Sequence, residues 1–143
     1  MATGLRIDIN TVMEQIELPE DQRAALATIH GVVGGQTNQG VYHRRALFHI
    51  HDTANSESPL NLAAWTLASA WRGMSLYPLT IVVTGRNADG DVTGLEEDLV
   101  HQAEAVVAMV RETVERWREQ PPLSNEAAAQ ELLAYAAREL AAA

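Results

Sequence analysis

The stretch TGLEEDLVHQAEAVVAMVRETVERW, residues 93–117, carries the strongest structural signal in the chain. From Leu99 to Trp117, apolar residues recur at alternating steps of three and four, which places them on one face of a helix. Thr93 and Glu96 have the spacing of a capping box, in which each side chain satisfies a backbone donor of the first helical turn. This stretch therefore predicts a long amphipathic helix, and the rest of the chain is interpreted around it.

Other segments combine helical spacing of apolar residues with a capping residue, or with a proline that suits a first turn. The clearest begins at Ser58-Pro59, and we expect Gly73 to cap its end. Residues 41–52 fit helix and strand templates about equally, and we predict a helix there from the alanine, the leucine and the two arginines. The remaining predicted helices cover 11–18, 19–33 and the segment from 124 onward.

A β-branched run, Ile81-Val82-Val83, predicts one short strand near 79–84. It could form a two-stranded ribbon with 91–93, although such a ribbon would be marginal alone. The predicted fold class is all-α or nearly so: one domain over 1–143, built as an irregular bundle of four to six helices, with one short β element near 79–84.

Composition limits the classes of function. The net charge of −9 argues against direct nucleic-acid binding, which depends on basic residues that neutralise phosphates. The absence of cysteine excludes disulfides and thiol catalysis, and it fits a cytoplasmic protein. No window is apolar enough for a membrane span, so we expect no membrane partner. Alanine supplies much of the apolar content, and such a thin core favours self-association.

Histidines provide the main chemical alternative. His43, His49 and His51 fall close together, and Asp52 adjoins His51. On a strand, His49 and His51 would share a face and could bind a metal together with Asp52, whereas on a helix they would diverge. No H-E-x-x-H pattern is present, so surface or capping histidines are the competing interpretation.

Two groups of residues are candidates for a protein interface. Trp65 falls on the flank of the helix predicted from Ser58, and large aromatic side chains commonly anchor protein contacts. Arg44 and Arg45, beside Tyr42, could contact a partner or an anion, or could simply lie on a solvated face.

Taken together, these features predict a small, acidic helical protein that functions in interaction or assembly. We expect it to bind itself or another protein in the cytoplasm and to need no cofactor, since no catalytic pattern marks any residue. One alternative is a metal- or histidine-dependent enzyme around His43, His49, His51 and Asp52. A second is an acidic regulator that occupies a basic surface of a nucleic-acid-binding partner, because opposite charges steer such encounters.

Overall fold

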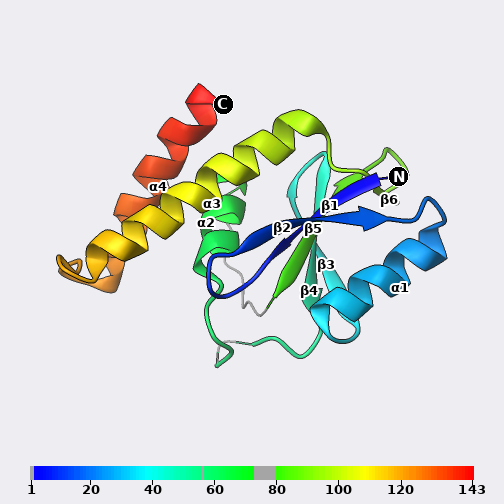
Figure 1. Ribbon diagram of the computed structural model, residues 1–143, viewed down its shortest axis with the longest axis horizontal. Helices are drawn as coiled ribbons and strands as arrows, with labels where there is room; N and C mark the ends of the chain where they lie inside the picture. The colour runs from blue at the N-terminus through cyan, green and yellow to red at the C-terminus, as the bar shows by residue number, and fades with distance from the viewer. Residues whose placement is uncertain (1, 56, 73–79) are drawn as a thin grey trace.

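The centre of the fold is a six-stranded antiparallel sheet, not a bundle of helices (Figure 1). The computed structural model describes residues 2–55, 57–72 and 80–143. Strands make up 25% and helices 46% of the described residues, which makes the fold α+β. The prediction of an all-α helical bundle is therefore wrong.

The elements in chain order are β1 (Ala2–Ile7), β2 (Met13–Leu18), α1 (Gln22–Val33), β3 (Thr37–His43), β4 (Ala46–His51), α2 (Leu62–Arg72), β5 (Ile81–Arg86), β6 (Val92–Thr93), α3 (Glu97–Trp117) and α4 (Asn125–Ala142).

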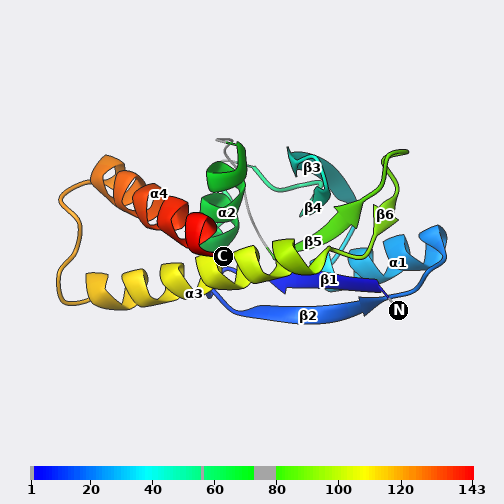
Figure 2. The ribbon, with the colours of Figure 1, turned by 90° about the horizontal axis from the view of Figure 1, so that it is seen from above.

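The strands follow the order β2-β1-β5-β4-β3, and β6 pairs with the end of β5. α1 covers one face of the sheet, while α2 and α3 cover the other and α4 packs against those two helices. Figure 2 shows that α3 and α4 form a hairpin extending well past the sheet. No helix in the described ranges is long and apolar enough to cross a membrane.

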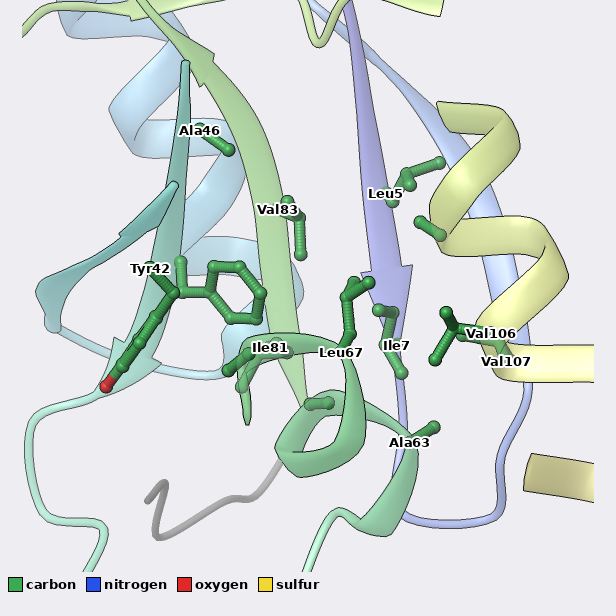
Figure 3. Packing of buried hydrophobic residues seen from close by; sticks show 14 of the residues in the cluster. Leu5, Ile7, Tyr42, Ala46, Ala63, Leu67, Ile81, Val83, Val106 and Val107 are labelled. Carbon is green, nitrogen blue, oxygen red and sulfur yellow. The ribbon is translucent and has the colours of Figure 1, made fainter. Parts of the chain in front are cut away.

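β5 shows why the sheet has a core on each face. Its alternate side chains point to opposite faces, as in any strand. Ile81 and Val83 join the cluster that includes Leu5, Ile7 and Leu67 under α2 and α3 (Figure 3). Val82 instead joins the cluster beneath α1. A strand buried on both faces is expected to be a continuous apolar run, which is the pattern that this segment shows.

The segment predicted as a helix over 11–18 is a strand. It forms a regular antiparallel hairpin with β1, in a register that runs from Ala2 opposite Leu18 to Ile7 opposite Met13. Thr11, the first residue of the predicted helix, instead has a positive φ of 62° in the connecting turn. The Asp8 carboxylate holds that turn by accepting bonds from the backbone N–H groups of Asn10 and Val12, at 2.9 and 3.0 Å.

Residues 41–52 are also strand, so the helix predicted there is wrong. β3 and β4 form a hairpin with its turn at Arg44-Arg45, and its register shifts between Gly40 and His43. The physical reason lies in burial, because Leu47 and Phe48 are consecutive residues and both are fully or nearly fully buried. A strand with a core on each face can bury both, since they point in opposite directions.

The long helix is confirmed in its course and its end, but it begins later than predicted. Thr93 belongs to β6, and the N–H of Leu95 donates to the carbonyl of Thr3, so the chain is still extended where the capping box was expected. Glu96 is the N-cap and makes no side-chain capping bond. The apolar face is buried over most of its length, because Leu99, Ala103, Val106, Val110 and Thr113 have no exposed area, whereas Trp117 at its end is half-buried.

Other helix boundaries confirm or correct particular predictions. Ser124 caps α4 as predicted, accepting a 3.0 Å bond from the N–H of Ala127. Gly34, with φ of 96°, ends α1 directly after the predicted range of 19–33. α2 is capped by Asn61 instead of Ser58, through a 3.0 Å bond from the N–H of Ala64. Gly73, the predicted end of that helix, lies outside the described residues.

Candidate functional site

An apolar groove of about 380 Å³ lies where the start of α2, the end of α3 and the start of α4 meet. Two tryptophans contribute to its walls, one from α2 and one from α3, and both are half-buried. Leu60 lies at its rim and is 53% exposed, whereas Leu132 is 1% exposed. The lining residues are Leu60, Leu62, Trp65, Trp117, Asn125, Ala128, Ala129 and Leu132.

Local structure explains how the chain assembles this groove. The Ser124 cap fixes the first turn of α4, so that Ala128 and Ala129 present small side chains to the groove. On α3, the Trp117 indole N–H points to a carboxylate oxygen of Glu131 at 3.4 Å. Trp65, the tryptophan predicted for an interface, lies in the wall of the groove.

Next to the groove, the connection between α3 and α4 carries Leu123, whose side chain is 100% exposed. It lies two residues before Asn125, which lines the groove. A fully exposed leucine alone needs no explanation, but one that lies two residues from a groove-lining residue adds exposed apolar area close to that groove. This combination is the strongest candidate site for a partner.

The histidines lie elsewhere and are separated by the sheet. His49 is fully buried on the face that α1 covers, and its Nε2 lies 2.9 Å from the Thr84 hydroxyl. Its Nδ1 is buried without a partner in the described structure. Burial, and secondarily the charge of His30, lower the pKa of His49 to about 4. His49 is therefore a neutral core residue at physiological pH.

His51 shares that face of β4, as a strand requires, but lies at its partly exposed end. Its Nδ1 is 3.5 Å from the Asp52 carboxylate and accepts a 3.1 Å bond from the N–H of Thr53. His43 lies toward the opposite face, with its ring 5.2 Å from that of Trp71. Within the described ranges, no three His, Cys, Asp or Glu side chains are arranged to hold a metal ion. The metal site and the enzyme based on it thus stay predictions from the sequence.

Tyr42 and Arg45 are engaged within the chain, whereas the Arg44 side chain is exposed. Tyr42 is 8% exposed, with its ring edge-on to that of Phe48 at 5.0 Å, and burial raises its pKa. The Arg45 guanidinium bridges Glu96 at 2.7 Å and Asp98 at 2.8 Å, at the start of α3. Arg44 is exposed, and its carbonyl accepts a bond from the Arg86 guanidinium.

The link from Arg45 to α3 joins residues about fifty positions apart, and nothing in the local sequence marks it. Hydrogen bonds from Arg45 lower the pKa of Asp98, so the carboxylate stays charged at the positive end of the helix dipole. The acidic residues at the start of α3 can be read from the sequence, but their partner Arg45 cannot.

Comparison with known proteins gives no family for this chain. It matches no protein-family model, no curated protein and no solved structure. Its function must therefore be inferred from its own surfaces.

Proposed function

We propose that the protein is a self-associating interaction protein and that the groove between α2, α3 and α4 is its dimer contact. The observation that carries this proposal is the pairing of an apolar groove with a fully exposed leucine beside it. Trp65 and Trp117 in the groove walls are the residue type that most often anchors protein interfaces.

A second copy of the chain is the occupant that best fits this arrangement. In a twofold dimer the same patch is used by both subunits, so the patch must be complementary to itself. Here a protruding side chain, Leu123, and an apolar groove lie at the same end of the molecule. A twofold axis between two such ends would bring each Leu123 toward the groove of the other copy.

Charge near the groove also permits this contact. A net charge of −9 opposes self-association in general. At this end, however, Glu131 lies 3.9 Å from Arg116, and Glu115 lies 3.5 Å from Arg118. These pairings reduce the repulsion that two acidic copies would otherwise meet.

Because the chain has no cysteine, we place the assembly in the cytoplasm.

The experiment that tests the proposal is sedimentation equilibrium over a wide range of protein concentration. We expect the average mass to rise from monomer to dimer. The substitution Leu123→Ser should weaken the dimer by at least about tenfold, since two leucines lose apolar burial. Leu123 is fully exposed, so its replacement leaves the fold intact.

Ile9→Ser is the matched control, because Ile9 is an exposed apolar residue, at 41%, in the turn between β1 and β2. It should leave the dimer unchanged. A chain that remains monomeric at every concentration would refute the proposal, as would an equal loss of dimer in the two variants.

A further inference from the structure

We propose that the outer edge of β2 binds an extended, arginine- or lysine-rich segment of a different protein, which adds a strand to the sheet. β2 ends the strand order, and β1 is the only strand that pairs with it in the part of the chain that the structure describes. Figure 2 shows β2 as the outermost strand beside β1. The backbone N–H and C=O groups that point outward from such an edge are a template for another strand.

β2 is suited to strand addition because it is regular. All six of its residues pair with β1 without a register shift, and no proline interrupts it. The opposite edge of the sheet differs: β3 has a register shift between Gly40 and His43, and the Arg72 guanidinium donates to the carbonyl of Val41 at 3.2 Å. Bulges and occupied backbone groups protect an edge from pairing. Of the two edges, β2 is therefore the one open to a partner.

The charge of β2 determines what kind of strand fits. Glu14 and Glu17 are exposed, and neither has an ion-pair partner among the described residues. They lie three positions apart, so their side chains point to opposite faces of the sheet. On the α3 side, Gln15 donates to Glu104 at 3.3 Å, which places one more carboxylate next to this edge. A strand with basic residues three positions apart could pair with both Glu14 and Glu17.

The same charges disfavour a second copy of this chain at β2. Two antiparallel β2 strands paired about their centre would place Glu14 opposite Glu17 of the other copy, twice over. Like charges directly opposite each other destabilise a strand pair. The partner is therefore a different, basic protein, and its site is separate from the groove proposed for self-association.

Fluorescence anisotropy with a labelled peptide of sequence TVRTVRTV tests this inference. The peptide presents basic residues three positions apart and has high strand propensity. We expect saturable binding that weakens as salt is added, because the contact is partly ionic. The same peptide N-methylated at its internal amides keeps its charge but cannot donate ladder bonds, and it should bind at least about tenfold more weakly. Equal binding of the two peptides would overturn strand addition.

Protein variants locate the binding site. Glu14→Gln combined with Glu17→Gln should weaken binding by about tenfold or more, since two ion pairs are lost. Glu57→Gln combined with Glu119→Gln changes the net charge equally, and both positions are exposed and lie outside β2. This control pair should leave affinity nearly unchanged, and an equal loss would overturn the assignment.

Hydrogen exchange of the peptide complex provides a readout that does not depend on mutation. Backbone amides within 13–18 should become protected when the peptide saturates the protein. Protection confined to other elements would refute β2 as the site, even if the peptide bound tightly.

Discussion

The imidazole Nε2 of His49 lies 2.9 Å from the hydroxyl oxygen of Thr84, inside the layer between the sheet and α1. The Thr84 hydroxyl also lies 3.1 Å from the carbonyl of Gly85, to which it donates. Because the hydroxyl hydrogen of Thr84 is used for Gly85, the Thr84 oxygen acts as the acceptor toward His49. Nε2 of His49 therefore carries the proton, and Nδ1 is unprotonated. Because Nδ1 is buried and has no partner, protonating it would bury a charge that no acceptor compensates.

The first prediction is that His49 makes stability depend on pH. Its folded pKa, about 4, is below the unfolded value of 6.5, so folding favours the neutral form. The stability that His49 contributes is fully present above pH 6.5 and is lost as the pH falls toward 4. The total loss is about 3 kcal/mol of the free energy of unfolding. Urea titrations across this pH range measure the effect.

His49→Gln provides the control for that titration. Glutamine can still donate to Thr84 but does not ionise, so the variant should lose less stability on acidification than the wild type. The other histidines are present in both proteins, and their contributions cancel in the comparison. Identical pH dependence of wild type and variant would show that His49 does not titrate as inferred.

The second prediction concerns the ion pairs at the start of α3. Arg45→Ala should raise the pKa of Asp98 toward its ordinary value, because the hydrogen bonds from Arg45 are the main cause of its lowering. Arg44→Ala changes the adjacent arginine, which makes no ion pair in the described structure, and should leave that pKa nearly unchanged. NMR titration of the Asp98 side chain distinguishes the two outcomes, and an equal shift in both variants would contradict the geometry.

The third prediction compares two possible caps of α2. The buried Asn61 accepts from the N–H of Ala64 and donates to the carbonyl of Ile7 at 2.9 Å, so it joins the helix to β1. Asn61→Ala should cost about 2 kcal/mol or more of unfolding free energy, because a cap is lost and a buried carbonyl loses its donor.

Ser58 was the cap expected from the sequence, and Ser58→Ala is the matched comparison. In the part of the chain that the structure describes, its hydroxyl accepts an exposed bond from the N–H of Asn55, at 3.0 Å, so the loss should stay within about 0.5 kcal/mol. Chemical denaturation of both variants checks the difference. If Ser58→Ala lost more unfolding free energy than Asn61→Ala, Ser58 and not Asn61 would be the cap of α2.

The sequence was informative where structure is local. The buried face of α3 follows from the spacing of Leu99, Ala103 and Val106, and the cap of α4 follows from Ser124, because helix bonds and caps join near neighbours in the chain. Strands depend on distant partners instead. The β-branched run of β5 predicted a strand, but its neighbours β1 and β4 are distant in the chain and could not be identified from its own residues.

The same distinction applies to the candidate sites. The spacing of Val12 and Ile16, four positions apart, fits a helix as well as a strand, and only the pairing of this segment with β1 settles it. Trp65 was identified as an interface candidate from its own helix, but the groove around it also needs Trp117 at the end of α3 and residues of α4, all more than fifty positions later in the chain. The partner of His49, Thr84, is 35 residues away and carries no local signal.

The last prediction uses two glycines whose substitution by alanine should have opposite effects. Gly31 lies in α1, where a Cβ atom would meet nothing within 4 Å. Gly31→Ala should stabilise the protein by about 0.5–1 kcal/mol, because glycine loses more backbone entropy in a helix.

At Gly85 in β5, a Cβ atom would clash with the carbonyl oxygen of Gly94, which is backbone and cannot rotate away. Accommodating it requires the chain around Gly94 to move off β5, where Thr93 pairs with Gly85. Gly85→Ala should therefore cost about 3 kcal/mol or more, as overpacking against fixed backbone does. Thermal and urea unfolding of both variants measure the two effects. Equal stability of Gly85→Ala and wild type would mean that the backbone at Gly94 does not pack against Gly85, and hence that the chain leaves β5 for α3 by a different path.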